Sequence, residues 1–467
     1  MRALFLQAPS FDGFDGGAGS RYQSKREIRS FWYPTWLAQP AALVENSKLI
    51  DAPPHGTSLA EVVAEARNFD LAVLHTSTPS FASDVKAITA LKAANPALKA
   101  GLIGARAAVD AEGALKSAPI VDFAARNEFD FTIKEIADGK DWKSIRGLTF
   151  RDANGEIQNT ADRDVLETMD SLPFVTPVYK RDLQLSRYFI GYLRHPYISL
   201  YTGRGCKSRC TFCHRYRTRS VGHVIEEIAW AKKAFPEVKE FFFDDDTFTD
   251  DLPRAEAIAR ELGKLGVVWS CNAKANVPRA ALKVMRDNGL RLLLVGYETG
   301  NQQILYNIKK GMRIDVAKRF AKDCRELGVT IHGTFIMGLP GETQETIKET
   351  IEFAKEVNPH TLQVSLAAPY PGTFLYKQAL ENGWLDDADA DLVNEDGRQI
   401  APLHYPGLSH TEIFDSVETF YRSFYFRPSK IAAIVGEMAI SPDMMKRRLR
   451  EGMEFFRYLR ERREIAH

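Results

Sequence analysis

The chain has 467 residues, which exceeds one ordinary compact core and indicates two or three domains. Its 62 basic and 61 acidic residues leave a formal charge of +1, so no global field attracts nucleic acid or an anionic surface. Hydrophobic residues make up 45% of the chain, but no stretch reaches the roughly twenty apolar residues of a membrane span, and the opening residues break off too early for a signal peptide, so we expect a cytoplasmic protein.

Residues 1–140 are predicted to form a Rossmann-like first α/β domain. Short apolar runs at 2–6, 71–75 and 100–103 alternate with helical patterns at 58–67 and 83–94, which indicates a doubly wound sheet of parallel strands. Ligands of such sheets bind beyond the carboxyl ends of the strands. There the chain carries these candidates: Thr76, Ser77, Thr78, Gly104 and Ala105. The alternative is that these loops only turn the chain.

Residues 141–190 are expected to connect this domain to the next. Two strand-like arms flank Asp152-Ala153-Asn154-Gly155, where a glycine suits the positive φ of a hairpin turn. Residues 170–174, Asp-Ser-Leu-Pro-Phe, then read as a linker. We expect no chemistry from this segment.

Cys206, Cys210 and Cys213 stand together in one loop. Their CxxxCxxC spacing lets three thiolates bind three irons of a 4Fe–4S cluster and leaves the fourth iron open. A structural zinc site is the alternative, but it needs a closed set of four ligands, and His214 is the available fourth. The chain has five cysteines in all, which is no disulfide framework and suits a reducing compartment.

Strand and helix patterns alternate through residues 191–385. Strands are expected at 197–201, 240–243, 267–272, 292–297, 330–337 and 362–367, with helices between them. Six strand–helix units are too few for a complete (β/α)8 barrel, so the sequence predicts a partial (β/α)6 barrel. Its chemistry should lie at the carboxyl ends of the strands.

Acids and glycines stand at several of these strand ends. Asp244, Asp245 and Asp246 follow the second strand and offer the acceptors that an ammonium group requires. They could instead be a charge cluster at a helix start. Glu298 ends the fourth strand, and Gly338 follows Ile336 at the end of the fifth.

The cysteine loop, with Phe212 before the third cysteine, resembles the signature of the radical S-adenosylmethionine (SAM) enzymes. The resemblance implies a 4Fe–4S cluster on the three cysteines, SAM bound at its open iron, and a 5′-deoxyadenosyl radical that abstracts hydrogen from unactivated carbon. A reductant such as flavodoxin or ferredoxin would supply electrons. The residues implied to contact SAM are Phe212, Asp244, Asp245, Asp246, Glu298, Ile336 and Gly338. No residue identifies itself as catalytic.

The first domain resembles the cobalamin-binding domain of the cobalamin-dependent radical SAM enzymes, which implies cobalamin at Thr76–Thr78, Gly104 and Ala105. The match is partial. Gly104 is followed by Ala105 where two glycines are usual, and Arg126-Asn127-Glu128 stands where a Gly-Glu pair is common. The first 140 residues have no Asp-x-His-x-x-Gly, so we expect no histidine on the cobalt.

Residues 386–467 are predicted to form a helical C-terminal region. An arginine-rich helix at 444–463 also carries Phe455, Phe456, Tyr458 and Leu459. Such a helix either lies on an anionic membrane surface or packs on the barrel with a solvated charged face.

Residues 31–40 (FWYPTWLAQP) and 201–210 (YTGRGCKSRC) are similar to the hopanoid-biosynthesis-associated radical SAM proteins of bacteria. This resemblance implies a cyclitol ether synthase that contracts the amino sugar of glycosylated bacteriohopanetetrol, and with this lipid a peripheral contact of the C-terminal helix with the inner membrane. One departure is that Cys213 passes directly into His214-Arg215, where that family usually has several more residues. The alternative activity is cobalamin-dependent methylation of an unactivated carbon of a lipid or other small molecule. A metal-binding scaffold without turnover would leave the strand-end acids and glycines without a common purpose.

Overall fold

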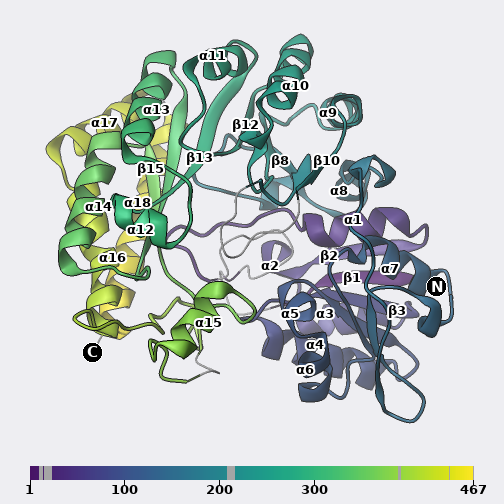
Figure 1. Cartoon of the computed structure of the whole chain (residues 1–467). Coiled ribbons are helices and arrows are strands. Elements are labelled where there is room, and N and C mark those ends of the chain that lie inside the picture. Colours follow the sequence, from purple (N-terminus) through teal and green to yellow (C-terminus); the bar gives the residue numbers. More distant parts are fainter. Residues whose placement is uncertain (10–13, 15–23, 208–215, 388–390, 441, 466–467) are drawn as a thin grey trace.

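The computed structural model describes residues 1–9, 14, 24–207, 216–387, 391–440 and 442–465. Its N-terminal part is a twisted sheet with helices on both faces, and its middle part is a curved parallel sheet that arches beside it (Figure 1). This arrangement confirms the predicted fold class, a doubly wound domain followed by a partial barrel and a helical C-terminal region.

Within the described residues, the first sheet has seven strands in the order β2-β1-β3-β4-β5-β6-β7. They are β1 (Ala3–Gln7), β2 (Ser47–Asp51), β3 (Leu71–His75), β4 (Lys99–Ile103), β5 (Phe123–Ala125), β6 (Leu148–Arg151) and β7 (Ile157–Asn159). The strands from β1 to β5 pair in parallel. All residues of β1 and β3 are buried, which explains why these strands are nearly continuous apolar runs instead of alternating ones.

Helices cover both faces of the first sheet. On one face, α1 (Thr35–Leu43) and α7 (Phe129–Ala137) bury Leu37 and Ile133 against Phe5 and Val73. The other face is covered by α3 (Leu59–Ala66), α4 (Phe81–Ala94), α5 (Ala105–Val109) and α6 (Ala111–Ser117), and the short α2 (Ala52–His55) follows β2. α3 begins at a capping box, in which the Ser58 hydroxyl accepts from the Glu61 N–H and the Glu61 carboxylate accepts from the Ser58 N–H.

The hairpin expected in the connector belongs to the first sheet instead. β6 pairs antiparallel with β5, so that Phe150 lies opposite Phe123, and β7 pairs antiparallel with β6. The physical reason is that β5 would otherwise be an exposed edge, and β6 satisfies its backbone hydrogen-bonding groups. The first sheet therefore extends past residue 140, and α8 (Thr176–Asp182) lies in the segment that follows it.

The second sheet, among the residues described, has six strands in the order β15-β14-β13-β12-β11-β8, and all neighbours pair in parallel. The strands are β8 (Tyr197–Leu200), β11 (Glu240–Phe243), β12 (Trp269–Ala273), β13 (Leu290–Glu298), β14 (Thr330–Met337) and β15 (Thr361–Leu366). The connecting helices lie outside the arc, as Figure 1 shows for α10, α11, α13 and α14. They are α9 (Val221–Ala234), α10 (Leu252–Leu265), α11 (Arg279–Asp287), α12 (Gln302–Asn307), α13 (Ile314–Leu327) and α14 (Gln344–Val357).

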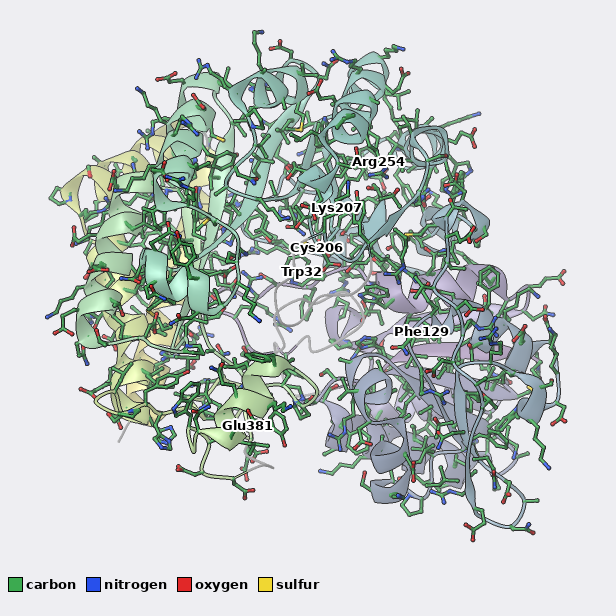
Figure 2. All side chains as sticks on the ribbon, in the orientation of Figure 1. Trp32, Phe129, Cys206, Lys207, Arg254 and Glu381 are labelled. Carbon is green, nitrogen blue, oxygen red and sulfur yellow. The ribbon has the colours of Figure 1, made fainter. Side chains whose placement is uncertain are left out.

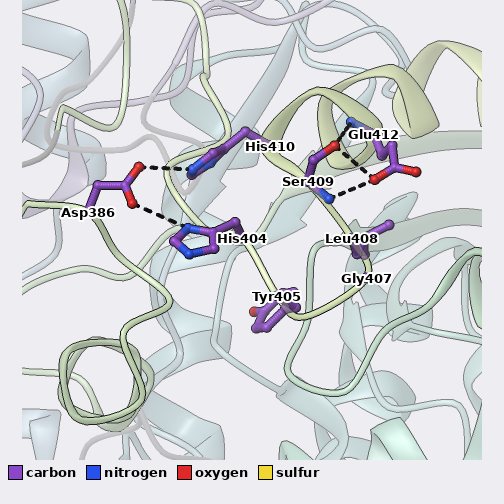
Figure 3. Close-up of a pocket in the computed structure, with 8 residues that line it drawn as sticks. All are labelled: Asp386, His404, Tyr405, Gly407, Leu408, Ser409, His410 and Glu412. Carbon is purple, nitrogen blue, oxygen red and sulfur yellow. Dashed lines mark hydrogen bonds and ion pairs between the residues drawn. The ribbon is translucent and has the colours of Figure 1, made fainter.

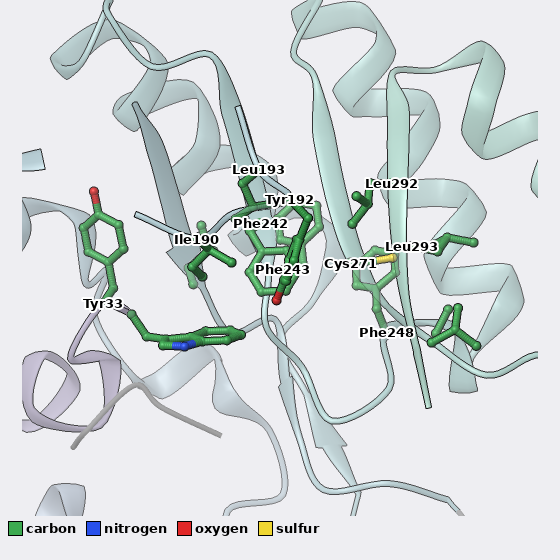
Figure 4. Close-up of a cluster of buried hydrophobic side chains, with 14 of the residues drawn as sticks. Tyr33, Ile190, Tyr192, Leu193, Phe242, Phe243, Phe248, Cys271, Leu292 and Leu293 are labelled. Atoms are coloured by element: carbon green, nitrogen blue, oxygen red, sulfur yellow. The ribbon is translucent and has the colours of Figure 1, made fainter. Parts of the chain in front are cut away.

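The barrel core is aromatic and aliphatic. Figure 4 shows Phe242, Phe243 and Phe248 packed near Cys271 and Leu292, and all five side chains are buried. Cys271 therefore lies in the core. Cys324 on α13 is equally buried, and burial raises the pKa of both thiols.

The sheet stops at β15 because side chains occupy the outer edge of this strand. The N–H groups of Leu362 and Val364 donate to the hydroxyls of Tyr425 and Tyr421, at 3.0 and 2.9 Å. The N–H of Leu366 donates to Oε1 of Gln399 at 2.9 Å. Both tyrosines belong to α16 (His410–Tyr425), which packs against β14 and β15. These side chains satisfy the outward N–H groups of β15, which another strand would otherwise bond. The sheet therefore ends at β15 and the barrel remains open.

Aromatic side chains join the first sheet to the barrel. The Tyr33 hydroxyl donates to the Tyr197 carbonyl of β8 at 2.7 Å, and the Tyr33 ring stacks on Tyr188 at 4.2 Å between centroids. The Tyr188 hydroxyl in turn donates to Asp51 at the end of β2. One continuous buried cluster thus runs from one face of the first sheet into the barrel.

Buried ion pairs form a second joint, at the base of the cysteine loop. β9 (Gly203–Arg204) precedes this loop, β10 (Arg217–Thr218) follows it, and the two strands pair antiparallel. Arg204 donates to both carboxylate oxygens of Asp130 on α7, at 2.6 and 3.2 Å, and its guanidinium lies 4.8 Å from the Trp36 ring centroid. Arg217 pairs with Glu128 just before α7. The first domain therefore holds both strands from which the cysteine loop extends.

The C-terminal helices pack on the barrel. α15 (Phe374–Glu381) and α16 lead to α17 (Pro428–Ile440) and α18 (Pro442–Ile465). Several α18 arginines contact protein groups: Arg447 donates to the Leu193 carbonyl at 3.0 Å, Arg450 lies over the Phe189 ring at 4.1 Å, and Arg462 donates to the Phe414 carbonyl at 2.7 Å. Along the part of the chain that the structure describes, no helix combines the length and apolar character needed to cross a bilayer.

The Asp130–Arg204 pair yields a stability prediction. Asp130→Asn should lower the free energy of unfolding by about 3–5 kcal/mol, because it removes the carboxylate to which the buried Arg204 guanidinium donates twice and leaves Glu128, at 3.8 Å, as its nearby acid. The matched control is Asp164→Asn, which breaks an Arg–Asp pair of 2.8 Å whose side chains are 51% and 84% exposed, and it should cost less than about 1 kcal/mol. Urea unfolding followed by tryptophan fluorescence measures both, and equal losses would contradict the role of the buried pair.

Candidate functional site

Cys206 lies at the carboxyl end of the first barrel strand, as predicted. Figure 2 shows it beside Lys207 in the middle of the molecule, between the barrel and the first sheet. Its thiol is half-buried, and its Sγ is 3.6 Å from the Thr247 hydroxyl. Cys210, Phe212, Cys213 and the alternative zinc ligand His214 lie outside the described residues.

The second strand end fixes the start of the cysteine loop. The N–H of Gly205, a residue with φ of 78°, donates to Asp246 Oδ2 at 2.8 Å, and the N–H of Lys207 donates to Asp250 Oδ2 at 2.7 Å. Backbone donors on both sides of Cys206 are thus held by carboxylates that follow β11. This contact sets the position of the thiol relative to the acids.

The structure brings Asp244, Asp245 and Asp246 together but gives each a different environment. Asp245 is buried, accepts from both the N–H and the hydroxyl of Thr202 at 2.5 and 2.6 Å, and has a pKa raised by burial. Asp244 is buried and accepts from Asn272 Nδ2 at 3.1 Å, whereas Asp246 is exposed. Asp245 therefore ties the ends of β8 and β11 together, and Asp246 presents its carboxylate to solvent beside the cysteine loop.

Glu298 ends the fourth strand in a left-handed backbone conformation, with φ of 62°. Its carboxylate forms an ion pair with Lys310, and both side chains are largely shielded. A Cβ on Gly296 would lie 2.5 Å from Glu298 Oε1 and 3.1 Å from Lys310 Nζ. The glycine therefore makes room for this pair to fold back over the strand end.

Ile336 and Gly338 close the fifth strand. Ile336 is half-buried, and Gly338 has φ of 84°. A Cβ on Gly338 would meet Ile413 of α16 at 2.8 Å, so packing against this helix already accounts for the glycine. The Gly338 carbonyl accepts from the Tyr405 hydroxyl at 2.8 Å, and its N–H donates to Glu342 Oε2.

The candidate cobalamin residues gather at the carboxyl ends of β3 and β4. Thr76 and Ser77 are buried, Thr78 is half-buried and Ala105 is exposed. Gly104 has φ of 104°, and a Cβ there would lie 2.4 Å from the Thr76 carbonyl oxygen and 2.8 Å from His75 Nε2. The two loops therefore touch, and His75 lies beneath the Gly104 turn, where burial lowers its pKa to about 4.

A direct contact joins this region to the barrel rim. A Cβ on Gly372, in the turn after β15, would lie 2.6 Å from Cγ1 of Val109 at the end of α5. Because α5 begins at Ala105, the same short helix connects the Gly104 turn to the rim of the barrel. The structure thus places the first-domain loops and the barrel strand ends on neighbouring surfaces.

The sequence pattern did not single out several charged residues of this site. Arg254 at the start of α10 donates to the carbonyls of Thr202 and Arg219, at 2.9 and 3.0 Å, and lowers the pKa of Asp245 against the effect of burial. Lys274 follows β12 and forms an ion pair with Asp250. Lys274 could have been found from the sequence, because functional residues of a parallel barrel lie at the carboxyl ends of its strands and Lys274 directly follows β12. The role of Arg254 depends on tertiary contacts that no local sequence pattern shows.

Glu342 yields a pH prediction. Burial raises its pKa to about 8, against the lowering effect of the hydrogen bonds from Gly338 and Leu339. The folded protein then binds more protons than the unfolded chain between about pH 4.5 and pH 8, so the free energy of unfolding falls as pH rises through this range.

Glu342→Gln should therefore flatten the decline of the thermal midpoint between pH 5 and pH 8. Glu412→Gln is the control, because Glu412 also accepts a backbone N–H but is exposed and has a lowered pKa. It should leave the slope in this range unchanged. A Glu342→Gln profile with the parental slope would show that this carboxyl does not titrate there.

Comparison with known proteins finds a family model that matches part of the chain, and relatives that match most of it. Residues 200–354 match the model of the radical SAM superfamily. An uncharacterised methyltransferase of Pyrococcus horikoshii is 28% identical over 423 residues, which are 86% of this chain and 90% of the relative. The anaerobic magnesium-protoporphyrin IX monomethyl ester cyclase of Rubrivivax gelatinosus is 24% identical over 91% of this chain and 77% of the relative.

A solved structure shares the fold over nearly the whole chain. It is that of the radical SAM methyltransferase TsrM from Kitasatospora setae with cobalamin and a 4Fe–4S cluster bound. The two have a TM-score of 0.66 at 14% identity, over 98% of this chain and 99% of that one. Residues 200–354, the part of the chain that runs from the end of β8 past β14, thus match the radical SAM superfamily model, and the fold of nearly the whole chain is shared with TsrM.

Proposed function

We propose that this protein is a cobalamin-dependent radical SAM enzyme that acts on an unactivated carbon of a small molecule. The observation that carries the proposal is the position of Cys206. Its thiol stands at the barrel rim among the acids that follow β11, on the side where Gly372 contacts α5 of the first domain. The shared fold with a structure that holds both cofactors supports the same arrangement.

The residues present fit these groups. Cys206, with Cys210 and Cys213, would hold the cluster, because Cys206 is a half-buried thiol beyond the first barrel strand and the three cysteines have the CxxxCxxC spacing. Asp246 and Glu298 would bind the ammonium and hydroxyl groups of SAM, since a carboxylate offers only acceptors. The Gly104 turn, which has no room for a side chain, and the Thr76–Thr78 loop would receive cobalamin. When bound, the cluster supplies the electron that cleaves SAM, and cobalamin supplies a methyl carrier or redox partner.

The chain's own residues would position and shield these groups. Asp245 and Thr202 lock the ends of β8 and β11 at a fixed separation, and Asp246 holds the Gly205 N–H in front of Cys206. Lys310 orients the Glu298 carboxylate over Gly296. The ion pairs of Arg204 and Arg217 with the first domain fix β9 and β10, which flank the cysteine loop, relative to that domain.

Methyl transfer is the first candidate for the reaction. It is favoured by the methyltransferase names of the Pyrococcus relative and of TsrM. The cyclase of Rubrivivax, which matches 91% of this chain, bears a different reaction name, so the architecture alone does not choose the reaction.

Contraction of the amino sugar of glycosylated bacteriohopanetetrol to a cyclitol ether is the second candidate. The runs at 31–40 and 201–210, which resemble the hopanoid-associated proteins, support it. An exposed apolar stripe on α18 also suits a lipid substrate: Met445, Leu449, Met453 and Phe456 are 42–64% exposed at helical spacing. Peripheral contact with the inner membrane through this stripe belongs to the same proposal.

The first test concerns the cysteine ligands. Cys206→Ala should abolish the bound iron, about four per chain in the parent, and with it reductant-dependent formation of 5′-deoxyadenosine from SAM. Cys324→Ala is the matched control, because its buried thiol on α13 lies in the core, and it should keep the iron. Iron analysis and chromatography of anaerobic reactions measure both. Turnover of SAM by Cys206→Ala would refute the assignment.

The second test follows the methyl group of SAM. With SAM labelled in its methyl group, methyl transfer puts the label into the product and forms S-adenosylhomocysteine. Ring contraction of the glycosylated bacteriohopanetetrol leaves the label in methionine and yields a product of unchanged carbon count. Mass spectrometry of product and by-products distinguishes the two candidates, and label in the lipid product would exclude simple contraction.

The third test addresses the α18 stripe. Leu449→Glu should reduce sedimentation of the protein with anionic phospholipid vesicles severalfold, because it places a charge in the exposed apolar stripe. The same change at exposed Tyr306, outside α18, is the control and should have no effect. Equal sedimentation of the parent and Leu449→Glu would contradict a membrane contact at this helix.

A further inference from the structure

Asp386, His404 and His410 converge in the segment between α15 and α16, apart from the strand ends described above. Figure 3 shows the Asp386 carboxylate facing both imidazole rings, with one oxygen toward each. Asp386 Oδ2 is 3.1 Å from His410 Nε2, Asp386 Oδ1 is 3.6 Å from His404 Nδ1, and one ligand atom of each residue lies within 4.8 Å of the others. A pocket of about 540 Å³ opens beside them, and none of the residues assigned above to the cluster, SAM or cobalamin lines it.

The hydrogen bond of His410 determines which of its nitrogens carries a proton. His410 Nδ1 lies 2.9 Å from the Ala401 carbonyl oxygen, and because a carbonyl only accepts, Nδ1 carries the hydrogen. In the neutral ring, Nε2 then bears a lone pair that points at the Asp386 carboxylate, itself only an acceptor. Two acceptors at 3.1 Å repel each other unless a proton or a metal ion lies between them. A ligating histidine characteristically donates its other N–H to a backbone carbonyl in this way.

His404 completes the set. Its Nδ1 is buried and, among the described residues, has no hydrogen-bond partner, although it faces Asp386 Oδ1 at 3.6 Å. The two imidazole centroids are 4.8 Å apart. Bonds of about 2.0–2.1 Å to a tetrahedral Zn²⁺ place adjacent ligand atoms roughly 3.3 Å from one another. The distances from Asp386 Oδ2 to His410 Nε2, 3.1 Å, and from Asp386 Oδ1 to His404 Nδ1, 3.6 Å, lie on either side of this value. Because the three ligand atoms, one from each residue, lie within 4.8 Å of one another, a bound ion would draw them closer together.

We propose that Asp386, His404 and His410 bind a divalent transition-metal ion, Zn²⁺ in the first place, with water in the remaining position. Imidazole and carboxylate donors favour Zn²⁺, Co²⁺ and Ni²⁺ over Mg²⁺ or Ca²⁺, which prefer oxygen alone. The Asp386 side chain is 76% exposed, so the ion can enter from solvent and keep a water ligand.

The proposed ion would stabilise a segment that supports the barrel. Residue 386 precedes the segment, His410 begins α16, and Tyr405 lies between them with its hydroxyl on the Gly338 carbonyl. His404 is further tied by its N–H to the Trp384 carbonyl. Metal binding would therefore cross-link the chain on both sides of Tyr405 and hold it against the end of β14. This site stands independently of the proposed reaction.

The test uses the full chain with Cys206, Cys210 and Cys213 replaced by Ala, so that no thiolate of the cysteine loop competes for the metal. Titration with Co²⁺ should produce the intense visible bands of a tetrahedral site, and Zn²⁺ should displace them. His404→Gln and His410→Asn should each weaken Zn²⁺ binding at least tenfold in isothermal titration. Asp386→Ala, at a position that is 76% exposed, should do the same.

His223→Gln is the matched control. His223 Nδ1 also faces an aspartate, Asp170 at 3.7 Å, but no second histidine of the described residues joins this pair, so the change should leave Zn²⁺ affinity unaltered. A second readout is the thermal midpoint, which Zn²⁺ should raise in the parent and in His223→Gln but not in Asp386→Ala. Undiminished Zn²⁺ affinity in both Asp386→Ala and His410→Asn, or a parent that binds no Co²⁺ at millimolar concentration, would overturn the proposal and leave a protonated His–Asp pair.

Discussion

The buried ion pairs of Arg204 with Asp130 and of Arg217 with Glu128 are the constraint on which the rest of the molecule depends. They join the first domain to the short ladder of β9 and β10. Because this ladder encloses the cysteine loop, the position of Cys206 is set by two domains at once. If the domains separated, each of these shielded charges would lose its partner, which costs several kcal/mol for a buried charge. The ion pairs therefore hold the two domains together.

The parallel barrel converts distant parts of the chain into one site. Parallel strands in common register bring their carboxyl ends to one rim, and residues that follow β8, β11 and β13 meet there. The acids after β11 differ in burial and therefore in role. Asp245 is committed to Thr202, whereas Asp246 stays exposed beside Gly205. Adjacent residues of the same type thus serve one structural and one accessible role.

Much of this organisation could be predicted from the sequence. The predicted ranges of the barrel strands agree with the structure to within a few residues, because each strand is an apolar run followed by a helical pattern. The CxxxCxxC spacing indicates the cysteine loop. The hairpin of β6 and β7 was assigned to a connector because its turn signal is local, whereas its pairing with β5 is not. The two residues of the Arg204–Asp130 pair are 74 positions apart, so no periodic pattern in the sequence indicates their contact. Likewise, the convergence of Asp386, His404 and His410 depends on how the segment before α16 folds back.

The tyrosine caps on β15 have a further consequence for the molecule in a crowded solution. An unprotected edge strand offers its backbone donors to any extended segment of another chain and so promotes intermolecular sheet growth. Here the outward donors of β15 are already bonded to Tyr421, Tyr425 and Gln399. The opening of the barrel can therefore remain available to a small molecule while its nearest strand offers no template for aggregation.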